Sequence, residues 1–144
     1  MAITTALCSV FKRDVMLGIH NLADTGGDQF KAALYQSSAT LGAATTAYTT
    51  TGEITGDAYT AGGVNLTNLG VTLSGTIAFP DFDGAQWGPG ASFTAAGMLI
   101  YNSTAAGNPA VAVISFEGDQ QVTNGTFTYQ FPVGDSANAV IRLI

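Results

Sequence analysis

The sequence predicts a mainly β protein, a jelly-roll-like antiparallel β-sandwich with one short N-terminal helix. About seven or eight stretches with strand character are separated by turn residues, and this is the strand number of a two-sheet sandwich. The stretch Thr126–Phe131 alternates polar and aromatic residues, so one of its faces suits solvent and the other suits a buried core. The length of 144 residues suits a single domain over residues 1–144.

The charge composition indicates that other protein covers much of the outer surface. Only 10% of the residues are charged, against about 25% in average soluble domains, while 47% are hydrophobic. No apolar run reaches the roughly 20 residues of a membrane-spanning helix. A net charge of −6 with only four Lys and Arg residues disfavours nucleic acid and anionic membranes. We therefore expect protein partners, with no nucleic acid and no membrane.

The start of the chain does not have the order of a secretory signal. Lys12 and Arg13 follow the first apolar residues, whereas a signal peptide places its cations before them. The single cysteine, Cys8, agrees with a protein made in a reducing cytoplasm. We expect synthesis in the cytoplasm and use there or after release without secretion.

Residues 1–18 are expected to form a short amphipathic helix or arm. Thr4 or Thr5 could cap it, and Gly18 could end it. Apolar positions recur at spacings of three and four, at Leu7, Val10, Phe11 and either Val15 or Met16, and Lys12, Arg13 and Asp14 mark the wet side. The helix could close one end of its own core, or Phe11 could contact a neighbouring subunit.

His20 and Cys8 are the residues in this region with the most reactive side chains. The sequence has no second histidine to complete a metal site, and the turn-forming run after His20 predicts a structural or solvated role. Cys8 lies between Leu7 and Phe11, which favours a buried, inert thiol.

A strand is predicted over residues 29–35, followed by a long uncharged connection over residues 36–57. Its only charged residue before Asp57 is Glu53, and Thr, Ser, Ala and Gly dominate it. Such small side chains can lie against another surface with few charges to desolvate. The connection could pack on its own domain or on a partner, with candidate contacts at Thr45, Tyr48 and Thr49. A short helical turn is expected over residues 43–48.

The second half of the chain supplies the remaining strand candidates. They cover residues 58–66, 70–79, 93–101, 110–116, 126–131 and 137–144, and Pro80 is expected to end the second of them. The segment 110–116 is apolar on both faces, which predicts a central or covered strand.

No local pattern supports catalysis, a metal or a cofactor. Asp81 and Asp83 resemble part of a calcium loop but lack the remaining ligands, and as a glycosidase pair they would lie on one strand. Trp87 stands among glycines, where it could stack on a sugar, contact a partner or fill the core. These observations predict a protein that is not an enzyme.

The order of segments resembles the head decoration, or cement, proteins of tailed bacteriophages. The resemblance runs along nearly the whole chain, through TALCSVFKRDVMLGIHNL, DQFKAALYQSSATLGAATTAYTTTGEITGDAYTAGG, FDGAQW, GMLIYNS and the final AVIRLI. It implies a jelly-roll-type fold, the major capsid protein as partner, and a place on the outer capsid surface of the virion. Such a protein would bridge capsomers and stabilise the shell.

Two questions stay open at this point. Symmetry favours a small closed homo-oligomer, a dimer first and a trimer second. The alternative function is a carbohydrate-binding or host-adhesion β-sandwich module of a phage particle, which would use Trp87.

Overall fold

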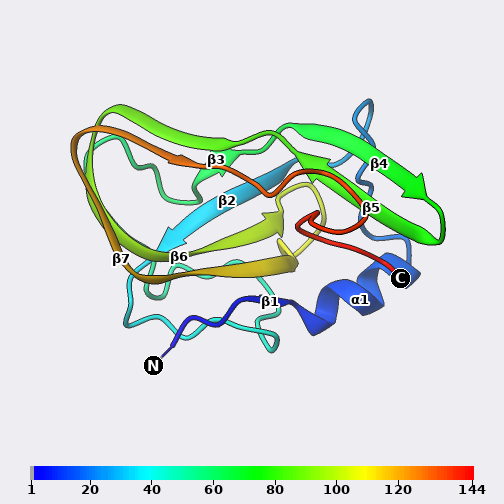
Figure 1. The fold of residues 1–144 in the computed structure, drawn as a ribbon. Coiled ribbons are helices and arrows are strands. Elements are labelled where there is room, and N and C mark those ends of the chain that lie inside the picture. The colour runs from blue at the N-terminus through cyan, green and yellow to red at the C-terminus, as the bar shows by residue number, and fades with distance from the viewer. Residues whose placement is uncertain (1) are drawn as a thin grey trace.

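The computed structural model describes residues 2–144 and has two antiparallel sheets and one short helix (Figure 1). Strands take up 48% of the residues and helix 6%. The predicted class, a mainly β antiparallel sandwich with a short N-terminal helix, is therefore confirmed. The larger sheet has the strand order β1-β7-β6-β2-β3, and β4 pairs with β5 in the smaller one.

The elements follow the chain in a simple order. They are β1 (Ala6–Leu7), α1 (Ser9–Met16), β2 (Phe30–Tyr35), β3 (Val64–Asn65), β4 (Asn68–Ser74), β5 (Ile77–Phe82), β6 (Ala85–Asn102) and β7 (Ala110–Tyr129). No helix among residues 2–144 has the length and apolar character needed to cross a membrane.

The long pair β6 and β7 forms the frame of the molecule. Figure 1 shows the two strands turning together at one end, so that each strand contributes to both layers. The pairing skips from Ala95↔Gln120 to Gly97↔Ser115, which leaves extra residues in β7. Glu117 and Gly118 lie there with φ values of 58° and 140°, as expected of a bulge that bends a strand. The predicted strands 110–116 and 126–131 are thus two halves of β7.

The core lies between these layers and is rich in aromatic rings. Every residue of β2 except Lys31 is buried, because β2 has β6 and β3 at its edges and packed layers on its faces. Phe30 packs on Phe82, with ring centroids 5.7 Å apart, and Phe82 on Phe131 at 5.8 Å. The apolar segment Ala110–Val113 of β7 is buried as well, which confirms the prediction of a covered strand.

The structure corrects several predicted strand boundaries. The expected single run over residues 70–79 is a hairpin of β4 and β5, and Pro80 lies inside β5 rather than after it. Most of residues 58–66 is irregular, with only β3 in strand conformation. Residues 137–144 form no strand, although Leu143 makes an isolated bridge to Ala78.

The N-terminal helix begins later than the sequence suggested. Its N-cap is Cys8, without a side-chain hydrogen bond, whereas the Thr5 hydroxyl accepts one from the Ser115 N–H and so ties the chain to β7. Gly18, with φ of 70°, follows the helix as predicted. The prediction that Asp14 faces water is wrong, because Asp14 is buried while Met16 is 88% exposed.

Candidate partner interface

Residues 40–49 of the connection form an uncharged surface of small side chains. A hollow of about 760 Å³ is lined by Ala2, Thr4, residues 40–47 and Thr49. Ala43, Ala44 and Thr46 are exposed on it. No charged residue is among those lining it, so a partner could cover this surface without desolvating a charge. We call residues 40–49 the Thr/Ala surface.

Glu53 holds the connection on its own domain. Its carboxylate accepts hydrogen bonds from the Tyr48 hydroxyl at 2.7 Å, the Tyr59 hydroxyl at 2.6 Å and the Gly62 N–H at 2.7 Å. Glu53 is 9% exposed. Hydrogen bonds to a buried carboxylate are among the stronger ones in proteins. The single charge of residues 36–56 is therefore used inside the molecule.

Further tyrosines complete this arrangement. The Tyr35 hydroxyl donates to the Thr49 carbonyl at 2.7 Å, and Tyr101 donates to the Gly62 carbonyl at 2.7 Å. Tyr48 stacks on Tyr101 with ring centroids 4.7 Å apart. Burial, together with the nearby Glu53 charge, raises the pKa of Tyr101 to about 12. Burial also raises the pKa values of the other three tyrosines, aided by the Glu53 charge at Tyr35 and by the hydrogen bonds to Glu53 at Tyr48 and Tyr59, so all four hydroxyls stay protonated and can donate.

Backbone contacts fix the rest of the connection. Ala47 bridges Pro109, and Leu41 bridges Ile3 in parallel. A turn closes from the Thr45 N–H to the Gly42 carbonyl at 3.0 Å, but the helical turn expected over residues 43–48 does not form. β-branched residues and glycine favour such bridges and turns over a helix. The Thr/Ala surface is thus displayed on an ordered segment.

The five predicted contact residues separate into two groups. Thr45, Tyr48 and Thr49 lie together in the connection and are half-buried, and each also makes an internal contact. Phe11 and Trp87 lie elsewhere and are buried, at 1% and 2% exposure. Their side chains offer no surface to a partner, which corrects that part of the prediction. Sequence reasoning missed Ala43, Ala44 and Thr46, whose only signal is the small size of their side chains.

Trp87 packs in the sandwich core. Its ring lies 5.8 Å from that of Phe127, at an edge-on angle of 61°. Phe11 similarly packs on His20, with ring centroids 4.9 Å apart. In this arrangement the indole face is not available for stacking on a sugar.

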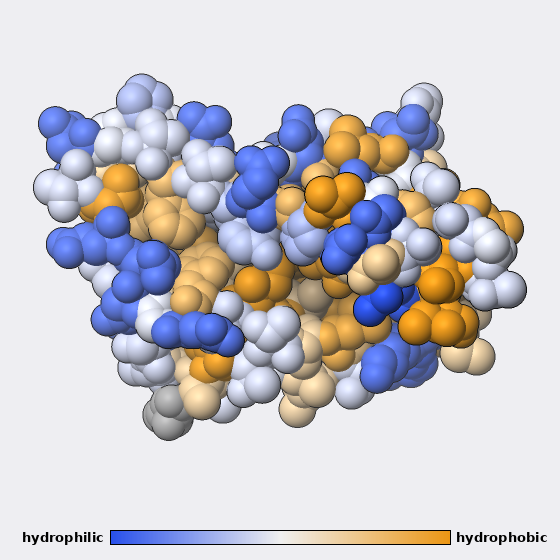
Figure 2. All heavy atoms as spheres, viewed as in Figure 1, coloured by the Kyte–Doolittle hydropathy of each residue, from blue (hydrophilic) through white to orange (hydrophobic). Residues whose placement is uncertain are grey.

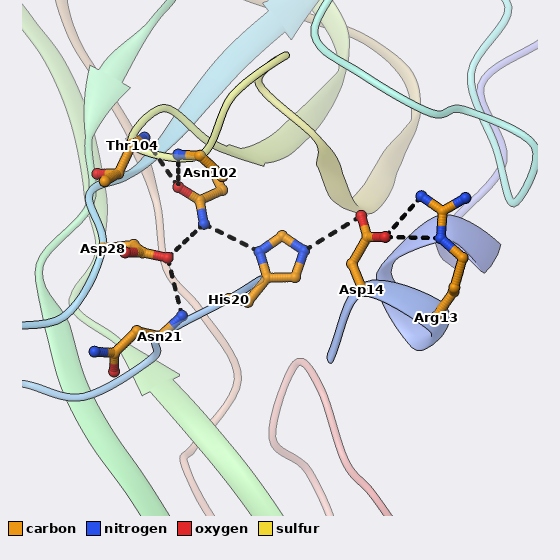
Figure 3. Close-up of polar contacts among 8 residues, drawn as sticks. Arg13, Asp14, His20, Asn21, Asp28, Asn102 and Thr104 are labelled. Atoms are coloured by element: carbon orange, nitrogen blue, oxygen red, sulfur yellow. Dashed lines mark hydrogen bonds and ion pairs between the residues drawn. The ribbon is translucent and has the colours of Figure 1, made fainter. Parts of the chain in front are cut away.

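A buried polar network joins α1 to the far end of β6 (Figure 3). Figure 3 shows a chain of contacts from Arg13 through Asp14, His20 and Asn102 to Asp28. Arg13 donates twice to the Asp14 Oδ1, at 2.9 and 2.7 Å. The His20 Nε2 lies 3.9 Å from the Asp14 Oδ2, and the His20 side chain is fully buried.

The hydrogen bonds of Asn102 determine the tautomer of His20. The Asn102 Oδ1 accepts from the Thr104 and Ala105 N–H groups, so its Nδ2 must be the atom that faces His20 and Asp28. The His20 Nδ1 therefore accepts that N–H at 3.1 Å, and the proton resides on Nε2. Burial lowers the pKa of His20, and the carboxylates of Asp14 and Asp28 offset this in part. The ring is thus neutral and hydrogen-bonded to Asn102, while its Nε2 N–H lies 3.9 Å from the Asp14 carboxylate, too far for a hydrogen bond.

The described residues offer few groups for chemistry. No cluster of three His, Cys, Asp or Glu side chains that could hold a metal occurs in residues 2–144. Asp81, in β5, and Asp83, just after it, each accept a hydrogen bond from the N–H of the next residue, at 2.9 Å. Cys8 is buried, and this burial raises its pKa to about 11, so its thiol is a poor nucleophile.

Comparisons with known proteins assign no family. No family model matches the chain, and neither a curated protein nor a solved structure is significantly similar to it.

Proposed function

We propose that this protein is a structural virion component that decorates the outer surface of a tailed-phage capsid. The observation that carries the proposal is the Thr/Ala surface, an uncharged segment anchored to its own domain at Tyr48, which donates to Glu53, and at Thr49, which accepts from Tyr35. A preordered surface loses little conformational freedom when a partner covers it. The resemblance in segment order to head decoration proteins supplies the class of partner, the major capsid protein.

The mechanism follows from binding thermodynamics. A subunit that binds only the mature shell lowers the free energy of that shell by mass action. Contact with two neighbouring capsomers adds avidity, because the second contact forms at a high effective concentration. The acidic net charge of −6 also disfavours contact with the genome.

The experiment measures binding of the purified protein to expanded empty capsids of the phage that encodes it. We expect the protein to sediment with the capsids and to raise their melting temperature. The double variant Ala44→Lys and Thr46→Lys places two charges on exposed positions of the Thr/Ala surface. Desolvating these charges should weaken attachment by tenfold or more, that is by about 1.4 kcal/mol or more.

The matched control is Thr126→Lys and Thr128→Lys, which adds the same two charges at exposed positions of β7. It should bind capsids like the unmodified protein, and circular dichroism should show that both double variants are folded. Absence of binding by the unmodified protein at micromolar concentration would contradict the proposed function. Equal binding by both variants would remove the Thr/Ala surface from it.

A further inference from the structure

The strand β4 has an open edge in this structure. It pairs with β5 on one side only. Within residues 2–144, no backbone hydrogen bond links residues 70–74 to any segment other than β5. An open strand edge presents a row of N–H and C=O groups that can pair with another chain.

The pairing register shows which groups point outward. In an antiparallel pair, opposite residues alternate between positions that exchange hydrogen bonds and positions that do not. Ala78 directs its N–H and C=O to Leu143, at 3.0 and 2.8 Å, so it does not bond to Leu73 across the hairpin. Val71, two residues before Leu73, is opposite Pro80, and because proline has no N–H these two residues cannot exchange a pair of hydrogen bonds. The N–H and C=O groups of Val71 and Leu73 therefore face the open edge.

The strand β4 itself lacks the usual safeguards against pairing. Natural edge strands carry Lys, Pro or inward charges that block association. No charged residue occurs between Asp57 and Asp81, and β4 contains no Lys or Pro. The Asp24 carboxyl group lies beside Gly70 at one end of the edge, whereas residues 71–74 carry no charged side chain of their own and can meet an identical stretch without placing like charges opposite each other.

The edge is also apolar. Leu69, Val71 and Leu73 are 52%, 54% and 71% exposed. A groove of about 690 Å³ lies beside Val71, and its lining includes the apolar Val15 and Leu143 as well as Asp24. Figure 2 shows apolar side chains gathered at the end of the molecule that carries α1, β4 and β5 in Figure 1. Exposed apolar clusters of this kind mark interaction sites.

We propose that two copies of this chain associate through antiparallel pairing of their β4 strands, centred on Thr72. This register places Val71 of each copy opposite Leu73 of the other in two hydrogen-bonded pairs, so the four outward N–H groups donate to the four outward carbonyls. Opposite side chains in such pairs lie about 5 Å apart on one face. Leu73 of the second copy then extends over the groove beside Val71, which adds apolar burial to the strand pairing.

A second copy fits better than an unrelated partner because the edge is self-complementary under a two-fold axis. The residues that face the open edge, Val71 and Leu73, are exchanged by that axis. Strand pairing alone buries less than the roughly 800 Å² per partner of a standard interface, so a stable dimer also requires burial of the groove and the exposed leucines. This inference does not depend on capsid attachment.

The first experiment tests the register by crosslinking. At the two-fold axis, Thr72 faces Thr72 of the second copy at a Cα separation of about 4.5 Å, which is within the range for a disulfide. Thr72→Cys should therefore form a covalent dimer under mild oxidation at least tenfold faster than Thr128→Cys, an exposed control on β7. The native Cys8 is buried and adds little background.

The second experiment measures the oligomeric state by analytical ultracentrifugation over the micromolar range. We expect a dimer, and a monomer for Leu73→Pro, since proline removes the outward N–H and leaves the β4–β5 hydrogen bonds in place. Leu73→Thr keeps that N–H and should weaken the dimer only a few fold. Circular dichroism checks the folding of both variants.

Two results would overturn this inference. One is a monomeric protein whose Thr72→Cys variant crosslinks no faster than the control, a result that remains decisive if Leu73→Pro fails to fold. The other is a dimer that persists in folded Leu73→Pro. A monomer that shows no faster crosslinking of Thr72→Cys and still binds capsids would overturn this inference alone, and a dimer that does not bind them would overturn only the proposed function.

Discussion

At the scale of single residues, Glu53 decides how the connection behaves. A carboxylate in a segment of Thr and Ala would ordinarily solubilise a loop, but here two tyrosine hydroxyls and one N–H surround it. The sequence shows a lone charge and four scattered tyrosines without showing that they meet. Only the fold brings Tyr48, Tyr59 and Tyr101 to one place.

Glu53→Gln should destabilise the protein by about 1–3 kcal/mol, because the amide replaces charged acceptors with a single neutral oxygen. Urea unfolding followed by circular dichroism measures this change. Glu117→Gln is the matched control, since Glu117 is exposed and its side chain makes no hydrogen bond among those described. The control should change the free energy of unfolding by less than about 0.5 kcal/mol. Equal effects of the two substitutions would contradict the structural role of Glu53.

His20 predicts how stability depends on acid pH. Its folded pKa lies below the ordinary value of 6.5, so below that pH the unfolded chain binds more protons than the folded one. Stability should therefore fall as the pH is lowered through about 6.5, because a proton on Nδ1 would break the bond from Asn102. Urea unfolding between pH 5 and 8 measures the slope.

The comparison for this prediction is His20→Gln, which cannot titrate in that range. Its stability should depend less on pH between pH 5 and 7 than that of the unmodified protein, whatever its absolute stability. The carboxylates that lie away from His20 contribute the same acid-range slope to both proteins and cancel in the difference. Identical slopes would show that His20 does not titrate as the buried geometry requires.

At the scale of elements, strands were predicted well where the side-chain pattern that marks them lies within the strand's own residues. Phe30–Tyr35 and the segment after Gly90 were found for this reason. The bend of β6 and β7 was missed because it depends on a bulge at Glu117 and Gly118, and an isolated Glu-Gly pair predicts a turn between strands as readily as a bulge within one.

The helix shows a second limit of local patterns. Periodicity located its apolar residues, but Asp14 is buried through contacts with Arg13 and His20, the latter outside the helix. A charged residue on a helix predicts a wet face unless a distant partner is known. Two of the five interface candidates, Phe11 and Trp87, were wrong for the related reason that large aromatic side chains fill a core as readily as they contact a partner.

At the scale of the whole molecule, the protein carries two chemically different exposed surfaces. The Thr/Ala surface consists of small uncharged side chains. The edge of β4 combines open backbone groups with large apolar side chains. A subunit with both could use one for self-association and the other for a capsid, and acidic residues elsewhere would keep the remaining surface soluble.

This division predicts how capsid attachment responds to salt. Charges farther apart than about 10 Å are screened at 0.1 M ionic strength, so an interface built on Coulomb attraction weakens strongly as salt is added. Residues 40–49 contain no charged group. The dissociation constant for expanded capsids should therefore change by less than about threefold between 0.05 and 0.5 M salt.

Capsid sedimentation at several salt concentrations measures this dependence, with Ala44→Lys and Thr46→Lys as the comparison. The added lysines give the surface two charges, so any residual binding of that variant should become salt-dependent while that of the unmodified protein does not. If capsid binding by the unmodified protein instead weakened tenfold over the same salt range, the contact would lie on its acidic surface. In that case Glu117 and Asp119, both exposed at the bend of β7, would be the residues to substitute next.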